Sequence, residues 1–267
     1  MLKLNAIALL RAIYPLAIQS PLQSIAQRMN WRITTIGFDA DDTLWHNEHL
    51  FEENHKRYCE LLSEYHDAET VEERLYETEM KNLELFGYGI KSFTLSCIET
   101  AINLTNGKIA TEEIRRIIDQ CRQMLAHPVE LLEGVSDVVE TLAKDYRLIL
   151  ITKGDLRDQE RKVARSGLAH CFDHVEVVSD KTVEVYDRVF RRNQVTADQF
   201  IMIGNSLKSD ILPILDLGGH AVHIPYHTTW KHERVDSPPH DHEFFYELQS
   251  ISQLPELIST LTANIES

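Results

Sequence analysis

Residues 33–44 read ITTIGFDADDTL, a short apolar run that passes directly into a cluster of carboxylates. Its first six residues are rich in β-branched and apolar side chains, which is typical of a buried strand in a parallel sheet. Because strand side chains alternate between two faces, Asp39 and Asp41 should point to the same side and Asp42 away from it. The stretch predicts a site at the end of this strand, although a turn or helix cap rich in Asp explains the same residues equally well.

Strand and helix patterns alternate in the second half of the chain. Strands are expected at residues 147–151, 174–178, 199–203 and 220–226, and helices at residues 135–143, 156–166, 183–192 and about 210–217. This alternation predicts a parallel sheet covered by helices on both faces, and the first strand belongs to the same sheet.

Residues 48–126 follow a different pattern, with apolar side chains at helical spacing and breaks near Gly87, Gly89, Asn106 and Gly107. They are expected to form an all-helical cap inserted into an α/β core made of residues 31–47 and 127–260. Residues 1–30 contain an apolar run that Arg11 and Pro15 interrupt, which favours a helical N-terminal extension over a signal peptide or a membrane span.

Composition favours a small substrate and a reducing compartment. The 42 acidic and 27 basic residues give a formal net charge of -15, which opposes binding to nucleic-acid polymers and to anionic membranes. The cysteines form no CxxC pair and are expected to be reduced, mostly buried thiols of a cytoplasmic protein; they are Cys59, Cys97, Cys121 and Cys171. The oligomeric state stays open, with a homodimer as one option.

Three later features follow predicted strands of the same sheet. The hydroxyl of Thr152, with the backbone amides of Lys153 and Gly154, can hold phosphate oxygens at the start of the next helix. Lys181 can pair with a phosphate and a nucleophile, and Asp210 can complete a cation site. Taken singly, each has an ordinary explanation as a helix cap or a solvated surface residue. Ligands of such sheets bind beyond the carboxyl ends of the strands, where these residues are expected to meet.

In this order, DADDTL, Thr152, Lys181 and GNSLKSD (residues 204–210) resemble the four motifs of the haloacid dehalogenase superfamily over roughly residues 33–226. The resemblance implies a Rossmann-like core with a helical cap inserted after the first motif. It implies that Asp39 is the nucleophile that forms an aspartyl-phosphate and that Asp41 is the general acid and then the base. It also implies that Thr152 and Lys181 bind phosphate and that Asp210 binds magnesium.

Asn205 departs from the family pattern, because phosphatases of this family often carry an acid there. Its amide oxygen can still hold Mg²⁺ or a metal-bound water, but with one negative charge fewer, so metal binding is expected to be weaker. Mg²⁺ would be held by Asp39, Asp210, Asn205 and the backbone carbonyl of Asp41, since hard oxygen ligands suit it. Neighbouring carboxylates and the phosphate are expected to raise the pKa of Asp41, so that it can protonate the leaving alcohol.

The sequence thus predicts a cytoplasmic, magnesium-dependent phosphatase of a small phosphorylated metabolite, with nucleotides, sugar phosphates and phosphoglycolate as candidate classes. A haloacid dehalogenase is the rival enzyme, but the dehalogenases of the superfamily lack a carboxylate at the position of Asp41. The rival outside catalysis is a metabolite-binding protein that has lost turnover. Substrate specificity is assigned to residues 48–126.

Two further groups of residues lie near the predicted site. Trp45, His46 and Asn47 are expected to line its entrance, and residues 227–233 to form a loop near its mouth. The histidines of the C-terminal region match no zinc motif and are expected to be surface and loop residues; they are His220, His223, His227, His232, His240 and His242.

Overall fold

The computed structural model describes residues 33–263, and the predicted N-terminal extension lies outside these residues. The strands are β1 (Thr35–Phe38), β2 (Arg147–Lys153), β3 (His174–Val178), β4 (Phe200–Gly204), β5 (His220–His223) and β6 (Phe245–Glu247). They form one sheet in the order β3-β2-β1-β4-β5-β6, and every neighbouring pair is parallel. The predicted parallel sheet is confirmed, with β1 near its centre.

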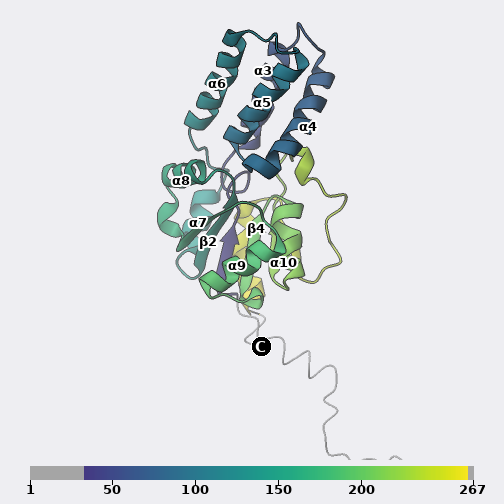
Figure 1. Ribbon diagram of the computed structural model, residues 1–267. Helices are drawn as coiled ribbons and strands as arrows, with labels where there is room; N and C mark the ends of the chain where they lie inside the picture. The colour runs from purple at the N-terminus through teal and green to yellow at the C-terminus, as the bar shows by residue number, and fades with distance from the viewer. Residues whose placement is uncertain (1–32, 264–267) are drawn as a thin grey trace, which may run out of the picture.

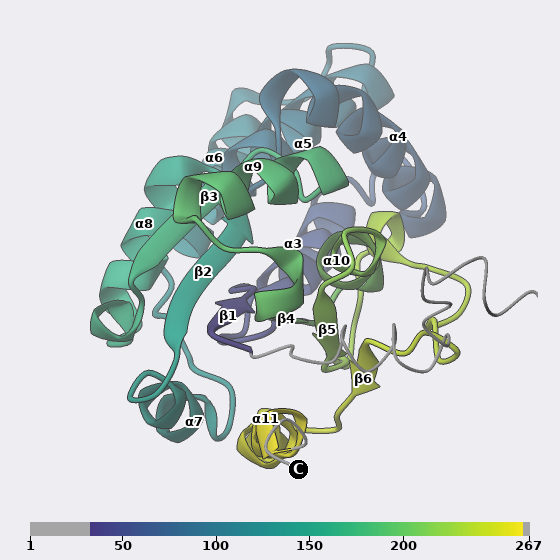
Figure 2. The same ribbon diagram turned by 90° about the horizontal axis from the view of Figure 1, so that it is seen from below.

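Helices cover both faces of the sheet (Figure 2). One face carries α7 (Val135–Leu142), α8 (Leu156–Arg165) and α11 (Leu254–Ala263), and the other carries α9 (Val183–Asn193) and α10 (Leu212–Asp216). In β2, Leu148 and Leu150 pack into the first layer, while Ile149 and Ile151 pack into the second. Both sets are fully buried, which explains why the strand is a continuous apolar run.

The helical insertion, residues 48–126, contains α3 (Glu48–Leu61), α4 (Ala68–Phe86), α5 (Ile90–Leu104) and α6 (Thr111–Ala126). These helices gather on one side of the core (Figure 1) and share a hydrophobic cluster of their own, which includes Tyr58, Leu75 and Phe93. The predicted breaks near Gly87 and Asn106 are present, but the break between α3 and α4 was not predicted. Asp67 caps the start of α4, because its side chain accepts a hydrogen bond from the backbone N–H of Thr70.

The structure corrects the sequence reading near the end of the chain. The strand expected at residues 220–226 ends at His223, and the helix expected near residue 210 starts with a π-helical turn, Leu207–Ile211. His220 and His223 are only 6% and 7% exposed, so the expectation of surface and loop positions is wrong for these two. The reason is that β5 lies between β4 and β6, and β6 is too short to give a clear sequence pattern.

Within residues 33–263, no helix combines the length and apolar character needed to cross a membrane.

Candidate active site

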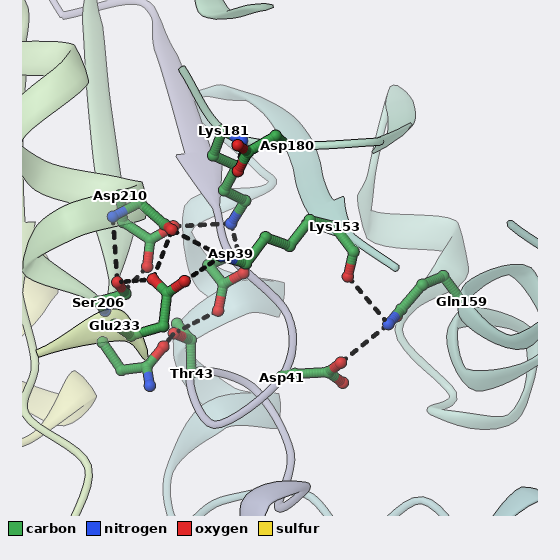
Figure 3. Close-up of polar contacts among 12 residues, drawn as sticks. Asp39, Asp41, Thr43, Lys153, Gln159, Asp180, Lys181, Ser206, Asp210 and Glu233 are labelled. Atoms are coloured by element: carbon green, nitrogen blue, oxygen red, sulfur yellow. Dashed lines mark hydrogen bonds and ion pairs between the residues drawn. The ribbon is translucent and has the colours of Figure 1, made fainter. Parts of the chain in front are cut away.

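A buried ion triad lies at the carboxyl end of β1 (Figure 3). The ammonium of Lys181 lies 2.5 Å from Oδ1 of Asp39 and 2.7 Å from Oδ1 of Asp210. All three residues are at most 7% exposed. Burial, helped by the charge of Asp210, raises the pKa of Asp39 to about 7 although Lys181 opposes the shift. Because two carboxylates share one ammonium, the triad carries an excess negative charge that a further cation would stabilise.

Asp210 owes its position to the residues that follow β4. It lies on the π-helical turn, and the backbone N–H of Ser206 donates a 3.0 Å hydrogen bond to its Oδ2. Gly204, the last residue of β4, allows the carboxylate to pack against the strand. A Cβ at Gly204 would lie 2.3 Å from Cγ of Asp210, which is closer than any van der Waals contact allows. Only glycine fits there without displacing Asp210.

The hydroxyl of Thr43 lies between side-chain oxygens of Asp39 and Asn205. It lies 2.9 Å from Oδ2 of Asp39 and 3.3 Å from Oδ1 of Asn205. A hydroxyl has one hydrogen to donate, so it can serve only one of these two acceptors. Together with Asp210, the side chains of Asp39 and Asn205 offer hard oxygen donors of the kind that Mg²⁺ prefers. Nowhere in the described part of the chain do three His, Cys, Asp or Glu side chains form a ready-made metal site, so such a site depends on the amide and on backbone oxygen.

Asp41 has a separate set of partners. Its carboxylate accepts hydrogen bonds from Trp45 Nε1 at 2.7 Å, Gln159 Nε2 at 2.8 Å and Lys162 Nζ at 2.9 Å. Figure 3 shows it directed toward Gln159, apart from the group around Asp39. Burial raises its pKa, but the charge of Lys162 and the three donors outweigh burial and lower the pKa. The expectation of a raised pKa is wrong for this arrangement, because the sequence did not reveal the lysine beside Asp41.

Asp42 points toward the start of the helical insertion. It adopts φ +64°, and its Oδ1 accepts hydrogen bonds from the backbone N–H groups of Asn47 at 2.8 Å and Glu48 at 3.1 Å. The carboxylate thus satisfies donors at the first turn of α3, a structural task that a carboxylate performs well.

The predicted phosphate-binding residues have different surroundings. Thr152 is 1% exposed and lines the cleft that also contains Asp39, Lys181 and Asp210. Its hydroxyl has no hydrogen-bond partner among the described residues. Lys153 also lines the cleft, but its ammonium binds Oε1 of Glu233 at 2.5 Å. Gly154 does not line it; a Cβ there would lie 2.9 Å from Nε2 of Gln159, so this glycine makes room for a partner of Asp41. Thr152 is left as a free donor for a ligand.

Glu233 is the main site residue that the sequence did not reveal. It is 8% exposed, and its Oε2 accepts hydrogen bonds of 2.6 Å from both Ser206 and Ser209. Burial raises its pKa, but Lys153 and the two hydroxyls lower it to about 2. The predicted approach of the 227–233 loop to the site is confirmed, since Glu233 and Trp230 line the cleft. Nothing in the sequence distinguishes Glu233 from other acidic loop residues.

The entrance residues are only partly as expected. Asn47 lines the cleft. Trp45 is 1% exposed and its indole N–H donates a hydrogen bond to Asp41. The expectation that Trp45 lines the entrance is therefore wrong. His46 does not line the cleft; its Nδ1 lies 2.7 Å from the hydroxyl of Tyr226.

The cleft extends from the ion triad into the helical insertion. Its outer part is lined by side chains of α3, α4 and α5, among them Glu48, Phe51, His55, Glu79, Leu83, Ser92 and Phe93. The ring of His55 stacks on Phe93 with centroids 5.2 Å apart. The geometry therefore offers a buried carboxylate, a nearby ammonium, a free hydroxyl and an enclosed space that continues between the helices of the insertion.

Comparison with known proteins agrees with this arrangement. Residues 33–218 match the family described as haloacid dehalogenase-like hydrolase. The chain belongs to this family. The expected relationship is confirmed, and with it the α/β fold of the haloacid dehalogenase-like hydrolases. The match covers β1 to α10, the part of the chain that carries Asp39, Lys181 and Asp210.

Several members of the haloacid dehalogenase-like family are similar to this chain. A haloacid dehalogenase-like family hydrolase from Xanthomonas campestris has 40% sequence identity and a TM-score of 0.78, covering 88% of this chain and 94% of that chain. The N-acylneuraminate-9-phosphatase of Homo sapiens is 25% identical over 88% of this chain and 97% of its own length. A glyceraldehyde 3-phosphate phosphatase of Methanothermobacter thermautotrophicus is 30% identical over 33% of this chain and 41% of its own length. The relatives support a phosphatase.

Proposed function

We propose that this protein is a magnesium-dependent phosphatase that hydrolyses a small phosphorylated metabolite through an aspartyl-phosphate on Asp39. One observation carries the proposal: Asp39 lies buried at the carboxyl end of β1, bound to Lys181, on the floor of a cleft where the hydroxyl of Thr152 has no partner. A cytoplasmic location belongs to the same proposal and is supported by four free cysteines.

The first step is attack of an Asp39 carboxylate oxygen on phosphorus, with departure of the alcohol. An anionic nucleophile and a phosphate dianion repel each other, so positive charge and hydrogen-bond donors must meet the phosphoryl oxygens. Lys181 supplies a charge beside Asp39, and Thr152 supplies a donor. Mg²⁺, held by oxygens of Asp39, Asp41, Asn205 and Asp210, would neutralise further charge on the phosphoryl group.

Asp41 handles the proton in both steps. In the first step it gives a proton to the departing alcohol oxygen, and in the second it takes one from the water that attacks the phosphorus of the aspartyl-phosphate. Its ion pair with Lys162 favours the carboxylate form that the second step needs. The first step requires Asp41 to leave Lys162 and to reach the leaving oxygen as a neutral acid.

The helical insertion serves as the cap in this proposal. The core residues address the phosphoryl group that all candidate substrates share, so discrimination needs contacts to the leaving group. Side chains of α3, α4 and α5 line the outer cleft and are placed to make those contacts.

The test is release of inorganic phosphate from p-nitrophenyl phosphate and a panel of phosphate esters, with Mg²⁺ and with chelator. We expect metal-dependent turnover that Asp39→Asn abolishes, because the substitution keeps the shape of the side chain and removes its nucleophilic charge. Thermal unfolding of the variant checks that it remains folded. Turnover of folded Asp39→Asn near the wild-type rate contradicts the assignment.

The same purified protein also tests the two alternative functions, a dehalogenase and a binding protein. A dehalogenase would release halide from a 2-haloacid and leave phosphate esters intact. A binding protein without turnover would do neither while still binding phosphate esters in calorimetry. Metal-dependent phosphate release excludes both as the main function.

A further inference from the structure

Two polar groups in the outer cleft lack partners. Oε2 of Glu79, on α4, is buried and has no hydrogen-bond partner. Ser92, on α5, is 8% exposed and lines the same cleft, and its hydroxyl has no hydrogen bond within residues 33–263. Glu48, on α3, faces the same space. Buried polar atoms are nearly always hydrogen-bonded, so the buried Oε2 of Glu79 is expected to meet a polar group of a ligand. The hydroxyl of Ser92, which lines the same cleft, is placed to meet that ligand too.

The charges around the cleft restrict that ligand. Eight carboxylates line it, against three lysines. Each lysine already binds a carboxylate: Lys181 binds Asp39 and Asp210, Lys153 binds Glu233, and Lys162 binds Asp41.

No lysine or arginine among the lining residues comes from the helical insertion. His55, on α3, is its one basic side chain there, and burial lowers its pKa, which favours the neutral imidazole. A substrate carboxylate placed in the outer cleft would meet no free cation of the described chain. Burying an unpaired charge is strongly unfavourable.

This inference rests on the proposed phosphatase function. We propose that Glu48, Glu79 and Ser92 bind the hydroxyl groups of an uncharged polyol leaving group, and that the outer cleft discriminates against phosphate esters whose leaving group carries a carboxylate. A carboxyl group can bind a hydroxyl in either protonation state, as an acceptor when ionised and as a donor when neutral. The substrate class therefore differs from that in the name of the N-acylneuraminate-9-phosphatases, since N-acylneuraminate is a sugar acid.

Burial raises the pKa of Glu79 to about 7 and that of Glu48 to about 8, with neighbouring carboxylates adding to the shift of Glu48. The shift of Glu48 agrees with a cleft in which carboxylates lie close together, while that of Glu79 follows from burial alone. A hydroxyl group of a substrate adds no charge to the outer cleft, whereas a carboxylate would.

Matched pairs of esters test the proposal. Glycerol 3-phosphate and 3-phosphoglycerate differ mainly in one hydroxymethyl or carboxylate group, and so do glucitol 6-phosphate and 6-phosphogluconate. At pH 8 we expect kcat/KM to favour the uncharged polyol of each pair by about tenfold or more, since like charges in a binding site cost at least that factor.

Variants identify the residues responsible. Glu79→Gln keeps the shape and removes the charge, so the preference for the polyol should fall at least threefold, and Ser92→Ala should lower kcat/KM for the polyol. Glu84→Gln, an exposed position on the same helix, is the matched control and should leave the preference as it is.

The outcomes separate the two proposals. If p-nitrophenyl phosphate and all esters are left intact, the phosphatase function itself is wrong. If esters are hydrolysed but the acid member of each pair is used as well as the polyol, the phosphatase stands and this inference is wrong. An equal change in preference for Glu79→Gln and Glu84→Gln also overturns it.

Discussion

The ammonium of Lys162 lies 2.9 Å from Oδ1 of Asp41 and 3.1 Å from Oδ2, so it contacts both oxygens of the proposed acid and base. Their side chains are only 14% and 21% exposed, which limits screening by solvent. The lysine thus opposes the effect of burial on the pKa of Asp41.

Lys162→Met should therefore raise the pKa of Asp41, because burial would act without the opposing charge. In the pH dependence of kcat/KM, the limb that reports Asp41 should move to higher pH. The limb should be more pronounced for an alkyl phosphate, whose departure needs a proton, than for p-nitrophenyl phosphate. Arg165→Met removes an exposed positive charge from the same helix and is the control. Equal profiles for the two variants would show that Lys162 does not set this pKa.

Asn205→Asp should strengthen Mg²⁺ binding by roughly tenfold, because a carboxylate replaces a neutral amide among the proposed ligands. Calorimetric titration of Mg²⁺ into the wild type and the variant measures the change without relying on turnover. The variant should also need less metal for half-maximal activity. Identical titration curves would remove Asn205 from the proposed metal site.

Gly204→Ala should weaken Mg²⁺ binding by about tenfold or more, because the new Cβ would displace the carboxylate of Asp210. The same titration gives the affinity, and thermal unfolding without metal checks that the sheet remains intact. A folded variant with wild-type affinity would mean that Asp210 adapts without loss or is not a ligand.

Glu233→Gln should destabilise the protein by roughly 3 kcal/mol at pH 7, the free energy that corresponds to a pKa of about 2 in the folded state against 4.5 for an unperturbed glutamate. Because the folded-state pKa is lowered, this contribution is full above the unfolded pKa and is lost as the pH falls from about 4.5 toward 2. Denaturant unfolding of both proteins at several pH values measures it.

Glu77→Gln is the control for that series. Glu77 forms an exposed ion pair with Arg74, and such pairs contribute little to stability, so its effect should be small at every pH. If Glu233→Gln behaves like Glu77→Gln, the buried bond to Lys153 does not stabilise the loop as the geometry indicates.

The sequence by itself determined the framework of this protein. The alternation of apolar strands and amphipathic helices predicted the parallel sheet, because each element must bury one face or both against its neighbours. The spacing of Asp39 from the end of β1 and the order of the later motifs predicted which residues follow the strands. The structure brings Asp39, Lys181 and Asp210 together because all three follow parallel strands of one sheet.

Only the tertiary structure decided the surroundings of these residues. Lys162 lies 121 positions after Asp41, and Glu233 lies 80 positions after Lys153. Spacing within a strand or helix carries no information about such pairs, since they form only when separate elements pack together. For that reason the sequence indicated where the proposed chemistry lies but gave the wrong direction for the pKa of Asp41 and no sign of Glu233.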